Sequence, residues 1–327
     1  MSRTLPQAKK AWLQRRRLPW ADRAFWATTA LFAFGILLLV SLIVYQLTVS
    51  AWPSLTKFGL GFLSGTTWDP VDAPGHNLFG ALPFIYGTII SALLALLIAV
   101  PLSLGVAIFL TELAPAWLRP PVSFAVELLA AIPSVVYGFW GITTLIPWSR
   151  AHFEPWLAHS LGFLPLFQDR GSAHDMLSAG FILAIMILPI ISAVAREILL
   201  AVPSTQREAL LALGATRWEV VRRVVLPYSR SGLLGAVILG LGRALGETMA
   251  VTMVIGNSPQ ILLSLLRPAD TIASRIANEF TEANSPLHLS ALIELGLVLF
   301  ALTLLVNALA RLLVWRVARR PEGTMHV

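Results

Sequence analysis

Six long apolar segments constrain the fold of this chain more than any other feature. A helix crosses the roughly 30 Å core of a bilayer with about 20 residues, and each segment is long enough to do so. Strands of a membrane β-barrel would be about 10 residues long and would alternate in polarity, whereas these runs are continuous. Charged residues make up 13% of the 327-residue chain, against about 25% in a typical soluble domain. The sequence therefore predicts an all-α membrane protein with six transmembrane helices, at Phe25–Val49, Phe84–Leu110, Phe124–Ile146, Met176–Ala195, Leu233–Ile255 and Ala291–Leu313.

The positive charges are distributed unevenly between the two sides of these predicted spans. Of the 24 Lys and Arg residues, 18 lie in the two tails and in two connections on the same side, and five lie in the opposite loops. Because positive charge favours the cytoplasmic side, both termini are expected in the cytoplasm. The net charge of +7 then reflects membrane topology, and no nucleic-acid partner is expected.

The same pattern predicts how the chain is divided. Residues 1–24 are expected to form a basic cytoplasmic N-terminal tail, and residues 316–327 a cytoplasmic C-terminal tail. Residues 25–315 form the six-helix membrane domain, with a cytoplasmic connection at 196–230. The first apolar run has about 25 residues, whereas the apolar part of a secretory signal peptide has about 7–15. We therefore expect this segment to be retained as a membrane helix.

The connection at 196–230 has the local signals of two short helices. Gln206–Leu213 is rich in helix-forming residues, and Gly214 suits the left-handed position that ends many helices. Thr216 with Glu219 three residues later is typical of a capping box at the start of a second helix. Pro227 is expected to stop that helix and to begin the next membrane segment. An amphipathic insert of this kind between two apolar segments indicates a docking surface.

The spacing within this insert resembles the coupling-loop signature of ABC importer permeases, EAA-x3-G-x9-I-x-L-P. Leu210 replaces the second Ala of the signature and Val224 replaces the Ile, and both changes are conservative. The resemblance implies that this loop binds an ATPase subunit. The residues that match the signature are Glu208, Ala209, Gly214, Leu226 and Pro227.

A wider resemblance covers about residues 25–315, to the phosphate-uptake permeases of the PstC type. It implies a type I ABC importer permease fold with cytoplasmic coupling helices in a bacterial inner membrane. It also implies a heterodimer with a PstA-type permease, two PstB-type ATPase subunits on the cytoplasmic side and a PstS-type phosphate-binding protein outside. The matching segments are Lys57–Leu60, Leu82–Thr88, Phe109–Pro115, Glu127–Gly138, Gly240–Thr252, Ala277–Phe280 and Leu287–His288.

The fifth apolar segment contains a charged pair. Arg243 lies near the midpoint of a predicted span from about Ser229 to Gly256, and Glu247 follows four residues later on the same helix face. A charge at the bilayer centre costs about 2.5–3.5 kcal/mol and usually faces the interior of the bundle. The planar guanidinium suits phosphate oxygens, so one interpretation is an anion site on the transport pathway. The other is an ion pair that only stabilises the fold, and the sequence does not decide whether Glu247 contacts substrate.

Neutral and outward-facing residues complete the candidates. Ser134 and Tyr137, beside Pro133, are expected to add hydrogen bonds to an anion in the pathway. The outer loops offer further side chains as contacts for the binding protein, although for any single one a solvated loop residue is the simpler interpretation. These outer candidates are Trp68, Asp69, Glu279, Glu282 and His288.

Several classes of function are disfavoured. The chain lacks a G-x4-GK[ST] loop, so ATP hydrolysis is expected on a separate subunit and the chain itself is not expected to be an enzyme. There is no cysteine, and the six histidines are scattered, so no metal, cofactor or catalytic residue is expected. Two alternatives remain. One is the permease of another oxyanion importer, for sulfate, molybdate or phosphonate. The other is an ATP-independent secondary transporter or channel, which would have no use for the docking loop.

Overall fold

The computed structural model describes residues 20–71, 77–168 and 174–318. Contacts divide the chain into two compact units, Met1–Val49 and Ser50–Val327. The described part of the first unit belongs to the long helix α1 (Trp20–Phe58). None of its most apolar stretch is buried, as expected for a helix whose surface lipid or other subunits cover.

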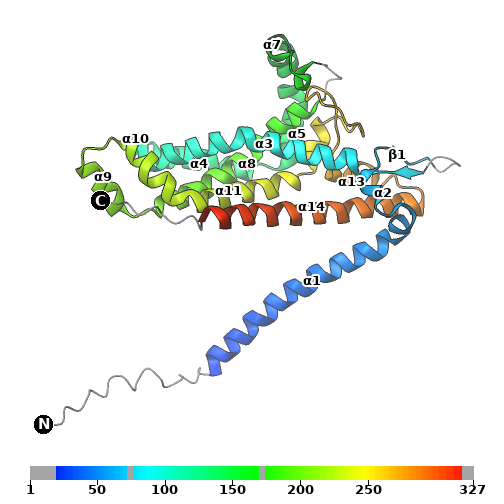
Figure 1. Cartoon of the computed structure of the whole chain (residues 1–327), viewed down its shortest axis with the longest axis horizontal. Coiled ribbons are helices and arrows are strands. Elements are labelled where there is room, and N and C mark those ends of the chain that lie inside the picture. The colour runs from blue at the N-terminus through cyan, green and yellow to red at the C-terminus, as the bar shows by residue number, and fades with distance from the viewer. Residues whose placement is uncertain (1–19, 72–76, 169–173, 319–327) are drawn as a thin grey trace. The chain divides into compact units, whose positions relative to one another are not determined.

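In the described part of the second unit the regular elements are helices and one small hairpin, in which β1 (Trp68–Asp69) pairs antiparallel with β2 (Leu78–Phe79). Figure 1 follows the helices along the chain. After the end of α1, they are α2 (Gly61–Ser64), α3 (Leu82–Ile108), α4 (Arg119–Ala131), α5 (Ser134–Trp140), α6 (Ile146–Trp148), α7 (Glu154–Leu161), α8 (Met176–Leu200), α9 (Ser204–Ala212), α10 (Arg217–Val220), α11 (Leu226–Leu245), α12 (Met249–Val254), α13 (Ile272–Glu279) and α14 (Pro286–Ala318). Wider π-helical turns occupy η3 (Phe109–Leu113), η4 (Gly141–Leu145), η5 (Ser149–Phe153) and η7 (Val221–Val225), and η6 (Pro165–Phe167) is a 3-10 turn.

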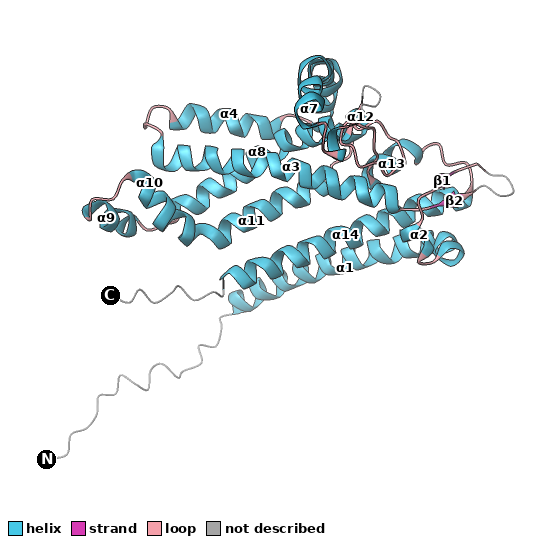
Figure 2. Ribbon diagram, turned by 45° about the horizontal axis from the view of Figure 1, so that its top comes forward, coloured by secondary structure: helices cyan, strands magenta, loops and turns pink. Residues whose placement is uncertain are grey.

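Helix α8 lies at the centre of this unit. In its most apolar window 67% of the residues are buried, against 28% in α3, in the helix that ends with α11, and in α14. It packs along α3 on one side and against α11 on another, and α11 packs against α14 (Figure 2). Gly240 of α11 allows the close approach, because a Cβ there would lie 2.6 Å from the Ile191 side chain of α8. A movement of α8 would therefore displace both α3 and α11, because closely packed helices transmit strain.

Among the described residues, five helices are long and apolar enough to cross a membrane. A sixth crossing is counted if the pair Arg119–Ala131 and Ser134–Leu161 is one span, although the two parts meet at 92°. This bent pair takes the place of the third span that the sequence predicts at Phe124–Ile146. The bend falls at Pro133, which lacks a backbone N–H and cannot continue the helix.

The structure also corrects two expectations about the fifth span. The helix does not continue to Ile255, since α11 ends at Leu245 and α12 begins only at Met249. Pro227 does not stop the preceding helix, because α10, η7 and α11 follow one another without interruption from Arg217 to Leu245. The proline falls in the first turn of α11, where no helical N–H is needed from it, and the wider η7 turn precedes it.

Candidate functional site

The break after α11 brings together the two charges that the sequence singled out. Arg243 lies in the last turn of α11, and its Nη1 is 3.0 Å from Oε2 of Glu247 in the non-helical link. The other carboxylate oxygen of Glu247 accepts a hydrogen bond from the backbone N–H of Ala250, at 3.3 Å. A cation at a helix C-terminus and an anion at the next N-terminus both suit the helix dipoles. The pair therefore sits at a helix break and not within the continuous helix that was expected.

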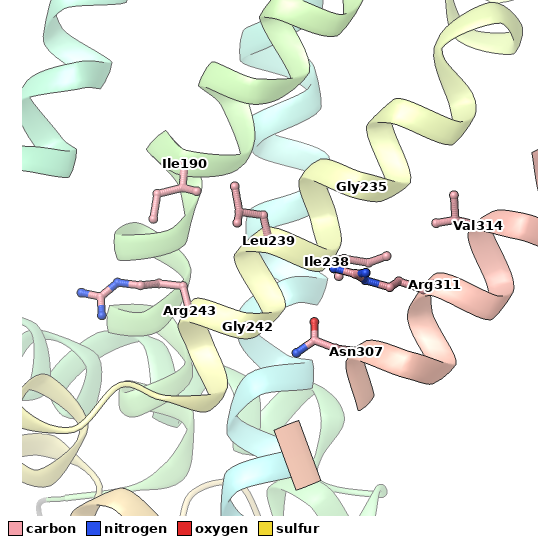
Figure 3. A pocket seen from close by; sticks show the side chains of 9 residues that line it. All are labelled: Ile190, Gly235, Ile238, Leu239, Gly242, Arg243, Asn307, Arg311 and Val314. Carbon is pink, nitrogen blue, oxygen red and sulfur yellow. The ribbon is translucent and has the colours of Figure 1, made fainter. Parts of the chain in front are cut away.

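The two members of this pair differ in exposure. The Glu247 side chain is 3% exposed, whereas that of Arg243 is 45% exposed. Arg243 also lines a groove of about 740 Å³ between α11 and α14, to which α8 contributes Ile190 (Figure 3). A Cβ at Gly242 would meet no atom within 4 Å, so the missing side chain leaves this face of α11 open. The full lining is Ile190, Gly235, Ile238, Leu239, Gly242, Arg243, Asn307, Arg311 and Val314.

Polar groups from α14 lie in the same groove and were not identified from the sequence. Arg311 and Asn307 extend from α14 on the side that faces α11 (Figure 3). The Asn307 amide donates to the carbonyl of Thr303 at 2.8 Å. The remaining side chains of the groove are apolar. The groove thus combines an apolar wall with two arginines, Arg243 from α11 and Arg311 from α14.

Ser134 and Tyr137 do not line this groove. The Tyr137 hydroxyl donates to the carbonyl of Leu129 at 2.7 Å and so fastens α5 to the end of α4 across the bend. Helix α5 packs on α12, where a Cβ at Gly138 would lie 2.7 Å from Sδ of Met253. Both residues lie on α5, which packs on α12, and their place on a transport pathway stays a prediction.

The predicted docking loop has the expected local structure. Gly214 has φ +85°, which L side chains rarely adopt. The Thr216 hydroxyl accepts from the N–H of Glu219, while the Glu219 carboxylate accepts from the N–H of Thr216. The helix indicated over Gln206–Leu213 is observed as α9 (Ser204–Ala212), and the capping box is confirmed.

The docking loop has one face that is exposed and one face that packs against the rest of the protein. Glu208 and Ala209 are exposed, and so are three large apolar side chains, Leu211, Leu213 and Trp218. Leu210 and Leu226 instead pack against the main core, while Pro227 is exposed. The bulk that Leu210 adds to the signature therefore points inward, and the outer face is left with the exposed apolar groups typical of a binding surface.

One residue of this loop makes long-range contacts that the sequence pattern did not reveal. Arg207 of α9 donates to the carbonyls of Leu199 and Val202, and its Nη2 lies 3.1 Å from Oε1 of Glu112 in η3. Glu112 and Arg207 are far apart in the sequence, so no local spacing links them.

The outer candidates form a buried network rather than an open contact surface. The Trp68 indole donates to Oε2 of Glu279 at 2.8 Å, and Nε2 of His288 lies 2.9 Å from the same oxygen. Trp68 and His288 are only 8% and 5% exposed. Three of the five proposed outer contacts are therefore used inside the fold, whereas Asp69 is half-buried and Glu282 is exposed.

Arg275 holds this outer network together. It pairs with Glu279 and, at 2.6 Å, with Asp270, and its guanidinium lies 5.0 Å from the centre of the Phe84 ring. Burial raises the pKa of Glu279, but Arg275 and the bonds from Trp68 and His288 outweigh it, so that this pKa is lowered. Burial raises the pKa of Asp270 to about 6, although the Arg275 charge opposes the shift.

Known proteins match this chain over most of its length. The family of binding-protein-dependent transport system inner membrane components matches residues 99–319. Proteins named phosphate transport system permease protein PstC match from Haemophilus influenzae (49% identity, 90% of this chain and 93% of that protein) and from Mesorhizobium japonicum (46% identity, 93% of each). The PstC 1 protein of Mycobacterium tuberculosis is 40% identical over 83% of this chain and 86% of its own.

Solved structures support the fold at lower identity. A bacterial alginate ABC transporter, solved with a periplasmic protein that holds an alginate pentasaccharide, has a chain that matches with a TM-score of 0.59 and 15% identity, covering 92% of this chain and 98% of that one. An inward-facing MetNI methionine ABC transporter matches with a TM-score of 0.51 and 20% identity, covering 73% and 94%. The chain belongs to the family of binding-protein-dependent transport system inner membrane components, and it has the fold of a type I ABC importer permease.

Proposed function

We propose that this protein is the membrane-spanning permease subunit of an ATP-driven phosphate importer and forms half of its translocation pathway. The printed names of relatives that are 40–49% identical support phosphate as the substrate. The proposal depends most on one observation, the half-exposed Arg243 at a helix break in the α11/α14 groove.

Arg243 has the chemistry to bind phosphate in transit. Its guanidinium remains charged and offers a planar set of donors that matches two oxygens of a phosphate. Glu247 occupies one side of this fork in the resting pair, at 3.0 Å. When HPO4²⁻ enters, its P–OH can donate to the Glu247 carboxylate while its other oxygens accept from Arg243. Sulfate at neutral pH has no such proton, so this pair would favour phosphate over sulfate.

The energy would come from other subunits. In this proposal two PstB-type ATPases dock on the exposed face of α9, with Glu208, Ala209 and Gly214 in the contact and Leu226 and Pro227 fixing the start of α11. A PstA-type permease completes the pathway, and a PstS-type protein delivers phosphate from outside. Both termini then lie in the cytoplasm of a bacterial cell with the chain in the inner membrane. Closure of the ATPase dimer would move α9 and tilt the helices around Arg243.

Reconstitution tests the substrate and the energy source together. The complex would be placed in lipid vesicles and labelled phosphate uptake measured with and without ATP, in the presence of excess sulfate, molybdate or a phosphonate. We expect uptake of labelled phosphate that depends on ATP and that only excess unlabelled phosphate, and none of the other anions, reduces strongly. Strong competition by another oxyanion would favour the importer of that anion, and uptake without ATP would favour a secondary transporter or channel.

A further inference from the structure

Arg207 connects the docking helix to two membrane helices at once. Its Nη1 donates to the carbonyl of Val202 at 2.9 Å, and its Nη2 donates to the carbonyl of Leu199 at 2.6 Å. The last carbonyls of a helix have no partner within that helix, and Leu199 lies in the last turn of α8. The same Nη2 is 3.1 Å from Oε1 of Glu112, in the turn that follows α3. One side chain of α9 therefore binds the ends of both α8 and α3.

This contact is better shielded from solvent than other ion pairs near the docking loop. The Arg207 and Glu112 side chains are 20% and 14% exposed. The Arg223–Glu219 pair is 3.9 Å long with side chains 71% and 40% exposed, and the Arg196–Glu127 pair is 3.9 Å long with 33% and 64% exposed. Exposed pairs contribute little because water and salt screen them. Arg207–Glu112 is thus the one of these three pairs that can hold two elements in a fixed relation.

The elements joined by Arg207 lead to the groove. Helix α3 packs along α8, and α8 packs against α11. Two glycines of α11 set this second contact, since a Cβ at Gly232 would lie 2.7 Å from Ile198 and one at Gly240 would lie 2.6 Å from Ile191. Arg243 follows three residues after Gly240. A displacement of the α3/α8 pair would reach Arg243 through these close contacts between α8 side chains and the backbone of α11.

We propose that Arg207 and Glu112 form a joint that passes the movement of α9 to the α3/α8 pair and that stays closed throughout the transport cycle. Arg207 is then a positioning residue for transport, and it contacts neither substrate nor nucleotide. The proposal rests on the proposed function, in which α9 receives the ATPase. It predicts that loss of the joint separates ATP hydrolysis from phosphate movement.

The first test measures both quantities in the same reconstituted complex. Arg207→Gln and Glu112→Gln are compared with Arg223→Gln and Glu197→Gln, which remove the same charges from exposed positions of the same region. We expect the complex to assemble and to hydrolyse ATP in all four. The number of phosphates carried per ATP should fall about tenfold in Arg207→Gln and about threefold in Glu112→Gln, within the range of known coupling effects. In the two control variants this ratio should stay at the wild-type value.

An unchanged ratio in both joint variants would overturn the proposal. If Arg207→Gln fails to assemble, Glu112→Gln and Arg207→Lys decide, since each leaves the other contacts of the loop in place. Normal coupling in both of them would then also overturn it. If the wild-type complex carries another anion, the proposed function fails, and the ratio of that anion to ATP still tests the joint.

A covalent tether asks whether the joint stays closed. The chain has no cysteine, so Glu112→Cys combined with Arg207→Cys gives two unique thiols that a short bismaleimide can bridge. The untethered double variant should be uncoupled, and the tethered one should regain at least about half of the wild-type ratio, because the bridge again joins α9 to the turn after α3. A tether that blocks uptake would show that the joint must open and would contradict the proposal.

Discussion

Two arginines of this protein illustrate how the same side chain can serve transport or structure. Arg275, on the side predicted to face outward, is 9% exposed and binds two carboxylates, a backbone carbonyl and an aromatic ring. Arg243, at the end of α11, is 45% exposed, and among the described residues its one ion-pair partner is Glu247. The donors of Arg275 are thus committed to the fold, whereas a large part of the Arg243 fork remains accessible from a groove.

The difference teaches where an anion can bind. A buried charge that loses its partners is costly, so an arginine like Arg275 cannot release its carboxylates for a passing substrate. Arg243 can rotate away from Glu247 with its own charge still exposed, while the buried Glu247 carboxylate keeps the hydrogen bond from the N–H of Ala250. Charge in an apolar chain is therefore not itself a sign of function, and the number of partners and the exposure separate the two roles.

The largest expected effect is structural and falls on the outer network. Replacement of Arg275 by Gln leaves Asp270 and Glu279 without their cation, and breaking such a buried pair costs about 3–5 kcal/mol. We expect most of the folded protein to be lost, as measured by the monodisperse fraction in detergent and by the thermal midpoint. Lys57→Gln, at an exposed position, should change neither. A stable Arg275→Gln protein that no longer transports would show that Arg275 acts in transport and would break the comparison.

The second effect is functional and should leave the fold intact. Arg243→Gln removes charged hydrogen bonds to the anion, each worth about 1.5–3 kcal/mol, so we expect phosphate uptake to fall about a hundredfold. The complex should still assemble, and its thermal midpoint should fall much less than that of Arg275→Gln, because the half-exposed Arg243 is the only partner lost and Glu247 keeps the hydrogen bond from the N–H of Ala250. Arg316→Gln, in the exposed last turn of α14, is the matched control and should retain uptake. Normal uptake by Arg243→Gln would remove Arg243 from the pathway.

The smallest expected effect is on the pH dependence of stability, and it tests whether the side predicted to face outward has a structural role. Burial raises the pKa of Asp175, at the start of α8, to about 6 from its ordinary 3.8. A carboxyl whose pKa is raised on folding stabilises the fold fully below pH 3.8, and this contribution is lost as the pH rises through 6. Asn at this position can still accept the N–H of Ser178, which Asp175 binds at 2.7 Å.

The free energy of unfolding, measured between pH 4 and 7, tests this contribution of Asp175 to stability. As the pH rises from 4 to 7, the free energy of unfolding of the wild type should fall by about 2 kcal/mol more than that of Asp175→Asn, given about 1.4 kcal/mol for each unit of pKa shift. Phosphate uptake at pH 7 should be the same in both. Parallel stability curves would show that Asp175 is not the titrating group, and a large change in uptake would give the outer side a role in transport.

Local signals predicted local structure well. The apolar runs identified the long helices, Gly214 marked the left-handed turn, and Thr216 with Glu219 marked the capping box. Each of these depends on residues within a few positions of one another, where backbone geometry and helix capping decide the outcome.

Tertiary relations were not predictable in this way. The end of α11 at Leu245 falls inside the apolar segment predicted at Leu233–Ile255 and was missed, since apolar length alone does not require a continuous helix. The sequence predicts that Pro227 stops the helix before it. A proline in the first turn of α11 is nevertheless compatible with the helix that continues from α10 through η7. The Glu112–Arg207 contact and the burial of Trp68 and His288 join segments distant in the sequence, and no local pattern encodes them.

The central claim is that Arg243 binds the transported anion and is not only the partner of Glu247. Uptake and complex assembly measured for Arg243→Met, Glu247→Leu and the double variant test it most directly. A buried ion pair with a purely structural role can often be replaced by apolar residues of similar volume without loss. We predict that the double variant assembles like the wild type but carries no phosphate. Recovery of uptake together with assembly in the double variant would contradict the claim.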